Sequence, residues 1–292
     1  MRQIGKRFCF SIAAALLICI ASHSASAQQV DKEATIYGQK IHYVEAGSGE
    51  AVILLHGLGG NATNWAFNIA ALAQKYRVIV PDQLGFGRSD KPFINYRIAT
   101  YVDFLDALYR ELKLERATLV GNSMGGWIAA AYTLAHPEKV ERLVLVDSAG
   151  FAPPAGFDAK TLSFLNPSTR AGMKQLALLV FSNKQLFTTD AAIDLMLTQR
   201  LAAGDGYTIQ SLIESIARRE DMLDDRLGGI KKPTLLVWGR DDGLVPLAEY
   251  GERFKREIAG AQLLILDGAG HAPQVEKAAE FNAALLNFLN AK

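Results

Sequence analysis

Ser123 lies midway between Gly121 and Gly125. The apolar run at residues 117–120 is typical of a buried β-strand, and residues 124–135 have the small and apolar composition of a helix that follows at once. Ser123 is therefore expected on a sharp turn between strand and helix, which only small residues two positions away allow. This G-x-S-x-G pattern, the nucleophile elbow, lifts a serine hydroxyl above the end of a sheet. It predicts nucleophilic attack by the Ser123 oxygen.

A serine hydroxyl needs an adjacent base to act as a nucleophile at neutral pH. The sequence has five histidines: His23, His42, His56, His136 and His271. The first lies in a predicted leader, the second in a predicted hairpin, and the third in a loop where we expect a structural role. His136 follows Ser123 by thirteen positions, which is roughly 20 Å along a helix and out of reach. His271 follows the last predicted strand in a glycine-flanked loop, so we expect it to be the base.

Short aliphatic runs alternate with amphipathic helices along most of the chain, which predicts an α/β protein. Runs that are apolar throughout are typical of parallel strands buried on both faces. The alternation stops between Asp147 and Lys232, where helical periodicity continues without strands. We interpret residues 151–230, approximately, as an all-helical cap inserted into the core. The expected strands cover residues 34–37, 40–44, 52–55, 78–80, 118–120, 143–146, 234–238 and 263–266.

The first 27 residues have the layout of a secretory signal peptide. Basic residues precede an apolar segment at residues 8–21, and Ala25 and Ala27 have the A-x-A spacing of a cleavage site. We therefore expect cleavage after Ala27, a mature domain at 28–292, a periplasmic or secreted location and no stable membrane partner. The alternative is an uncleaved anchor, although the segment is short for a spanning helix.

The composition excludes some classes of partner. A chain of 292 residues with a net charge of +1 has no excess of basic residues for nucleic acid. No Walker A sequence, no G-x-G-x-x-G before a helix and no histidine pair at metal spacing occurs. We expect no cofactor and no metal.

Several motifs together resemble the α/β-hydrolase family, and the resemblance covers nearly all of the mature chain. They are His-Gly at 56–57, Asp-Gln-Leu-Gly-Phe-Gly-Arg-Ser at 82–89, Gly-Asn-Ser-Met-Gly-Gly at 121–126, Trp-Gly-Arg-Asp-Asp at 238–242 and Gly-Ala-Gly-His-Ala-Pro at 268–273. The resemblance implies the α/β-hydrolase fold, a mostly parallel doubly wound sheet with the cap inserted. The third and fourth motifs resemble the branch that hydrolyses carbon–carbon bonds in ring-cleavage products, and they also resemble generic esterases.

The resemblance implies a catalytic acid after the strand at 234–238. In the family pattern the acid stands three residues after a glycine and four before a proline, which Asp242 satisfies with Gly239 and Pro246. Asp241 would then form the turn. Asp147 is the alternative, because some members take the acid from the end of the preceding strand.

The resemblance also implies an oxyanion hole made by the backbone N–H groups of Met124 and Leu58. Trp65 is a candidate pocket wall or a buried core residue. Arg200 is a candidate substrate anchor, because a cap arginine at a comparable place in carbon–carbon hydrolases meets the substrate carboxylate; otherwise it lies on an exposed helix face.

These expectations together predict a serine hydrolase of small to medium apolar carboxylic esters, with Ser123, His271 and Asp242 as its triad. The cap supplies many apolar side chains for such a pocket, among them Phe151, Phe157 and Phe181. One alternative is a carbon–carbon bond hydrolase of vinylogous diketones. The other is a non-catalytic family member that binds a ligand.

Overall fold

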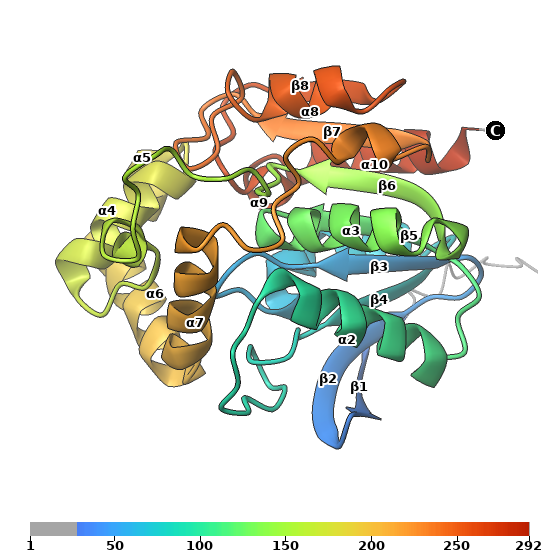
Figure 1. The fold of residues 1–292 in the computed structure, drawn as a ribbon, viewed down its shortest axis with the longest axis horizontal. Coiled ribbons are helices and arrows are strands. Elements are labelled where there is room, and N and C mark those ends of the chain that lie inside the picture. Colours follow the sequence, from blue (N-terminus) through green and yellow to red (C-terminus); the bar gives the residue numbers. More distant parts are fainter. Residues whose placement is uncertain (1–27, 292) are drawn as a thin grey trace, which may run out of the picture.

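The computed structural model describes residues 28–291, which form one mostly parallel sheet with helices on both faces and a helical cap at one end (Figure 1). The sheet has eight strands in the order β1-β2-β4-β3-β5-β6-β7-β8. Each expected strand is present, so the predicted α/β-hydrolase architecture is confirmed. The strands are β1 (Val30–Ile36), β2 (Gln39–Ala46), β3 (Ala51–Leu55), β4 (Arg77–Pro81), β5 (Ala117–Asn122), β6 (Val140–Val146), β7 (Thr234–Gly239) and β8 (Gln262–Leu266).

The sheet begins with an antiparallel hairpin and continues as parallel strands. Strands β1 and β2 pair antiparallel through a turn at Tyr37 and Gly38, which have φ angles of 51° and 77°. Strand β2 also pairs antiparallel with β4, whereas β4, β3, β5, β6, β7 and β8 pair parallel in that order. The carboxyl ends of the parallel strands therefore meet at one edge of the sheet, where α/β proteins place their ligand sites.

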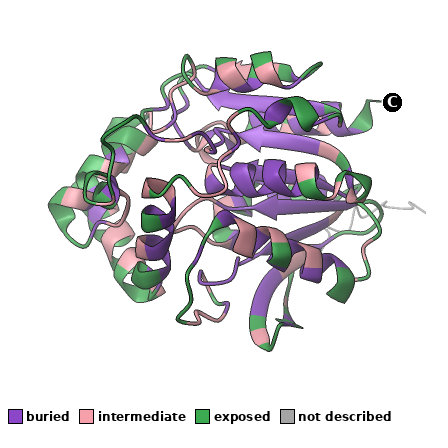
Figure 2. Ribbon diagram, in the orientation of Figure 1, coloured by how far each residue is buried: buried purple, intermediate pink, exposed green. Residues whose placement is uncertain are grey.

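Helices cover the two faces of the sheet and create two apolar cores. Helices α2 (Ile98–Glu111), α3 (Met124–Ala135) and α8 (Gly251–Glu257) contribute to one core, and α1 (Ala66–Leu72) and α10 (Ala278–Asn290) to the other. In Figure 2 the central strands are almost continuously buried, and buried residues on the flanking helices face the sheet. This double coverage explains why the strands are apolar throughout rather than alternating.

The segment between β6 and β7 forms the cap and contains no strand within the described residues. Its helices lie together beyond the carboxyl ends of the strands (Figure 1). A small core of Met173, Ala177 and Ile193 joins two of them. The cap helices are η3 (Thr161–Leu165), α4 (Arg170–Val180), α5 (Lys184–Phe187), α6 (Asp190–Ala203) and α7 (Gly206–Ala217), whereas η4 (Leu227–Gly229) packs against α3 and α8 of the α/β domain.

The remaining short helices belong to the α/β domain rather than to the cap. They are η1 (Ala62–Trp65), η2 (Pro137–Lys139) and α9 (Pro273–Glu276). Among residues 28–291, no helix is both long and apolar enough to cross a membrane. The predicted signal peptide at residues 1–27 lies outside the described residues.

Candidate active site

Ser123 occupies a strained backbone conformation between β5 and α3. Its φ and ψ are 56° and −118°, a region that residues with a side chain rarely adopt, at a cost of about 1–3 kcal/mol. The neighbouring backbones come too close for side chains. A Cβ at Gly121 would lie 2.2 Å from the carbonyl oxygen of Gly125, and one at Gly125 would lie 2.2 Å from that of Leu55. Both glycines are therefore required by close packing of main chain against main chain.

Hydrogen bonds hold the strained turn in place. The Ser123 N–H donates to the Val146 carbonyl oxygen at 2.9 Å, which ties the turn to the end of β6. The Ser123 carbonyl oxygen accepts from Gly126 N at 3.0 Å and from Trp127 N at 3.1 Å. The serine side chain consequently stands at the carboxyl edge of the sheet, at the start of α3.

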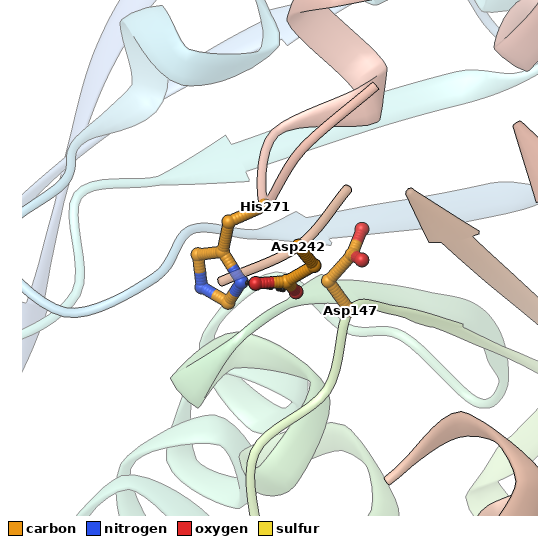
Figure 3. Close-up of side chains that lie close together, drawn as sticks. All are labelled: Asp147, Asp242 and His271. Carbon is orange, nitrogen blue, oxygen red and sulfur yellow. Dashed lines mark hydrogen bonds and ion pairs between the residues drawn. The ribbon is translucent and has the colours of Figure 1, made fainter. Parts of the chain in front are cut away.

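His271 and Asp242 are joined by a short hydrogen bond. His271 Nδ1 lies 2.7 Å from Asp242 Oδ2, and both side chains are almost fully buried (Figure 3). Asp242 Oδ1 accepts from the backbone N–H groups of Leu244 at 2.8 Å and Val245 at 3.1 Å. These three hydrogen bonds fix the orientation of the carboxyl group. The arrangement leaves His271 Nε2 as the ring nitrogen that can accept a proton.

The loop that carries His271 is anchored on two sides. The His271 N–H donates to the Val180 carbonyl oxygen at 2.6 Å, which links the loop to the cap. The Asn122 side-chain amide donates to the carbonyl oxygens of His271 at 3.0 Å and Val146 at 3.1 Å. Asn122, the residue before Ser123, therefore connects the His271 loop to the turn. The sequence alone does not reveal this role, because the second position of G-x-S-x-G is variable in the motif.

Glu276 forms a second link between the histidine loop and the cap. Its Oε1 accepts from Gly270 N at 2.8 Å, and its Oε2 accepts from Ser182 N at 2.9 Å and Asn183 N at 3.0 Å. One carboxylate thus joins the residue before His271 to the loop after α4. No pattern in the sequence indicated this contact, because it pairs segments that are far apart in the chain.

The three candidate acids differ in what they contact. Asp241 is exposed and accepts from Ser182 Oγ at 2.6 Å. Asp147 is fully buried, and its Oδ1 accepts from Gly239 N at 2.9 Å. Burial and the negative charge of Asp242 raise the pKa of Asp147 well above the ordinary range. Of the three, Asp242 is the one hydrogen-bonded to His271, so the geometry favours the predicted assignment.

Asp147, Asp242 and His271 together have the residue types of a metal site, and one donor atom from each lies within 4.8 Å of the others. Hydrogen bonds from Gly239 N to Asp147 Oδ1, from Leu244 N to Asp242 Oδ1 and between His271 Nδ1 and Asp242 Oδ2 already engage one or more atoms of each side chain. These bonds favour an acid–base role for the Asp242–His271 pair over a metal site.

The expected oxyanion donors, Met124 and Leu58, line the same cavity as Ser123. Met124 is the first residue of α3, so its N–H has no acceptor within the helix. Leu58 lies in the loop after β3. Below this loop, His56 is fully buried: its Nε2 accepts from Gln83 N at 3.1 Å, which leaves Nδ1 to donate to the Gly57 carbonyl oxygen at 2.8 Å. Burial lowers the pKa of His56, so it is a neutral support for the loop.

A cavity of about 490 Å³ connects Ser123 and His271 with the cap. Its walls are mainly aromatic and aliphatic, and its polar lining includes Asn64, Ser215 and Gln274. Among residues 28–291, no lysine, arginine, aspartate or glutamate lines it. The three aromatic cap residues named from the sequence, Phe151, Phe157 and Phe181, all line it. Further apolar cap residues on its wall are Phe164, Leu165, Leu176 and Phe187.

Two expected site residues lie elsewhere. Trp65 is fully buried and packs against Phe281, with ring centroids 6.1 Å apart, in the core below the loop. It is absent from the cavity wall, which corrects its interpretation as a pocket wall. A large apolar side chain after a glycine-rich loop suits either place, so the sequence left both open.

Arg200 also differs from both expectations. It is neither on the cavity wall nor on an exposed helix face: its side chain is 11% exposed and forms an ion pair with Asp205, which is 1% exposed. A Cβ at Gly59 would lie 2.6 Å from Arg200 Nη1. The guanidinium group therefore rests on the loop that carries Leu58. The buried partner explains the difference, because nothing in the spacing of Arg200 and Asp205 revealed that they turn inward.

A buried aspartate–histidine pair and a serine on a strained turn meet at one cavity, an arrangement that suits hydrolysis through a serine nucleophile. The comparisons agree, since the family described as alpha/beta hydrolase fold matches residues 50–278. The chain belongs to the α/β-hydrolase family and is a hydrolase.

Individual relatives cover nearly the whole chain. A 2-hydroxy-6-oxononadienedioate/2-hydroxy-6-oxononatrienedioate hydrolase of Cupriavidus pinatubonensis is 35% identical over 86% of this chain and 90% of its own length. A meta-cleavage product hydrolase from Pseudomonas fluorescens is 31% identical with a TM-score of 0.80, covering 89% and 97% of the two chains. A membrane phospholipase A described as a bacterial virulence factor is 27% identical with a TM-score of 0.77, covering 90% and 87%.

Replacing the two adjacent aspartates separates the acid from the turn residue. Asp242→Asn removes the carboxylate that orients His271 and is expected to lower kcat roughly 10⁴-fold. Asp241→Asn changes an exposed side chain and is expected to lower kcat less than about threefold. Steady-state hydrolysis of a p-nitrophenyl ester measures both, with Ser123→Ala as the inactive reference. Reversed losses would identify Asp241 as the acid.

Removing Arg200 is expected to destabilise the fold, because Asp205 would remain buried without its partner. Arg200→Ala should lower the free energy of unfolding by about 3–5 kcal/mol. The matched control is Arg240→Ala, which breaks the exposed ion pair with Asp267 and should cost at most about 1 kcal/mol. Urea denaturation measures both changes. Equal losses of unfolding free energy would show that the buried ion pair stabilises the fold no more than the exposed one.

Proposed function

We propose that this protein hydrolyses carboxylic esters with an apolar acyl group through an acyl-enzyme intermediate. The observation that carries the proposal is the cavity next to Ser123. It is apolar, and among residues 28–291 no lysine, arginine, aspartate or glutamate lines it. A pocket of this kind favours an uncharged, hydrophobic substrate.

The proposed mechanism assigns one role to each residue. Ser123 Oγ attacks the ester carbonyl carbon while His271 Nε2 accepts the serine proton, and Asp242 holds the ring through Nδ1. The N–H groups of Met124 and Leu58 donate to the oxygen of the tetrahedral intermediate. His271 then gives the proton to the departing alcohol. A water molecule, activated by the same nitrogen, releases the carboxylic acid and restores the serine.

A second candidate is hydrolysis of a carbon–carbon bond in a vinylogous diketone. The names of several relatives favour it, including two that are 35% and 31% identical. The dienedioate in the first of those names is a dicarboxylate, and a carboxylate in an apolar pocket requires a cation or strong donors. Arg200, the expected cation, is paired with Asp205. This pairing is the reason that we rank ester hydrolysis first.

A substrate panel distinguishes the two candidates. We expect kcat/KM for p-nitrophenyl esters to rise with acyl chain length, by up to about tenfold for each 1.4 kcal/mol of added apolar contact, until the cavity is filled. We expect at most trace turnover of a carboxylated vinylogous diketone. Ser123→Ala should abolish activity on every member. Efficient turnover of the diketone with poor ester hydrolysis would reverse the ranking.

Export is a separate proposal, supported by the basic, apolar and A-x-A segments at residues 1–27. Protein purified from its native host should begin at Gln28 when its N-terminus is sequenced. Full-length protein found only in the membrane fraction would instead indicate an uncleaved anchor.

A further inference from the structure

Asp147 is held rigidly at the carboxyl end of β6, behind the triad acid. Its φ is 42°, and its N–H donates to the Val237 carbonyl oxygen at 2.9 Å. Its Oδ1 accepts from Gly239 N at 2.9 Å, which ties the side chain to the end of β7. The residue is 0% exposed. Both the backbone and one carboxyl oxygen are therefore fixed.

The other oxygen of Asp147 has no partner among nitrogen or hydroxyl donors. Oδ2 is buried and without a hydrogen bond in the described part of the chain. Figure 3 shows the side chain beside Asp242, on the side away from His271. One donor atom from each of the three residues lies within 4.8 Å of the others. An orphaned acceptor next to a carboxylate would be strongly unfavourable, unless it carries a proton.

The two carboxyl groups are unequally supported. Asp242 receives two backbone N–H donors and the His271 ring, whereas Asp147 receives only Gly239 N. Two buried carboxyl groups in one cluster repel each other when both are charged, which favours the neutral form of the less supported group, Asp147. The titratable ring of His271 lies within 4.8 Å of this cluster, and the charged groups that raise the pKa of Asp147 are Asp242 and, on α9, Glu276. Both are acidic and favour its neutral form.

We propose that Asp147 is a neutral carboxylic acid that donates its proton from Oδ2 to the Asp242 carboxylate. In this role it is a positioning residue for the triad. It supplies Asp242 with a fourth donor and keeps the carboxylate turned toward His271, and it shares part of the negative charge. The sharp turn after β6 thus supports two parts of the triad. Its Val146 carbonyl oxygen accepts from Ser123 N, and its Asp147 side chain donates to Asp242.

The proton on Asp147 has a measurable effect on folding. Burial and the neighbouring charge raise its pKa in the folded protein far above the value of 3.8 that applies when it is exposed. Between these values the folded state binds one more proton than the unfolded state, so stability falls as pH rises. The amide of Asp147→Asn has no such proton. The folding equilibrium constant of the wild type, relative to Asp147→Asn, should therefore fall about tenfold per pH unit from roughly pH 4 up to the raised pKa of Asp147 in the folded protein.

Urea denaturation of both proteins at pH 5, 6 and 7 measures that ratio. Asp241→Asn, at an exposed carboxyl group, is the matched control and should give no comparable slope. A ratio that is independent of pH would overturn the proposal. If Asp147→Asn fails to fold, ¹³C NMR of the aspartate carboxyl groups in the wild type replaces it. One aspartate should remain protonated at pH 7, and complete deprotonation of all of them would contradict us.

Kinetics test the positioning role, and this arm alone rests on the proposed ester hydrolysis. Asp147→Asn replaces one neutral donor by another, so kcat should fall less than about threefold and the acid limb of kcat/KM should stay within about 0.3 pH units. Asp147→Leu removes the donor to a charged group, and kcat should fall roughly 10- to 150-fold. Its acid limb should move to higher pH, because the undivided charge of Asp242 then favours the imidazolium form of His271.

The outcomes separate failure of this inference from failure of the proposed function. If Asp147 were ionised, Asp147→Asn would remove a negative charge near His271, and its acid limb would move to lower pH. That result would overturn the inference while leaving ester hydrolysis intact. An inactive wild type on all esters would contradict the proposed function, and the folding measurement would still decide the state of Asp147.

Discussion

The structure depends on a close approach of main chain to main chain at the start of α3. Gly121 and Gly125 allow β5, α3 and β3 to pack at distances that no Cβ would tolerate. This contact places Ser123 in its strained conformation, and the hydrogen bond to Val146 keeps it there. The Asn122 side-chain amide then fixes the loop of His271 relative to this turn, because it donates to the His271 carbonyl oxygen. The site is therefore a product of backbone packing first and of side-chain chemistry second.

Much of this arrangement could be predicted from local sequence. The strands were recognisable because each is a short aliphatic run buried on both faces, and the helix at 124–135 matched α3 to the residue. Order along the chain and distance along a helix were enough to select His271 among five histidines. The choice of Asp242 over Asp241 required a family pattern, because two adjacent aspartates after one strand are equivalent in local sequence. Their difference lies in contacts with distant loops.

What could not be predicted depends on contacts between distant segments. Arg200 turns inward because Asp205 is buried beside it, and Trp65 packs against Phe281 from the last helix. The links made by Asn122 and Glu276 likewise join residues that only the tertiary structure brings together. Local periodicity carries no information about such pairs. The residues whose positions were predicted wrongly are accordingly those whose positions depend on contacts with a residue elsewhere in the chain.

The position of the cap between two neighbouring strands has a consequence for how the family diversifies. Val146 and Val237 pair in the same sheet, yet the whole cap lies between their strands as one long connection. The entropy lost on closing a flexible loop grows only with the logarithm of its length, about 0.6 kcal/mol for each doubling. The cap also has a small apolar core of its own, so its folding depends less on contacts with the sheet. The connection can thus be lengthened, shortened or exchanged at little thermodynamic cost. The residues that line the pocket can therefore change while the sheet and the turn at Ser123 stay the same.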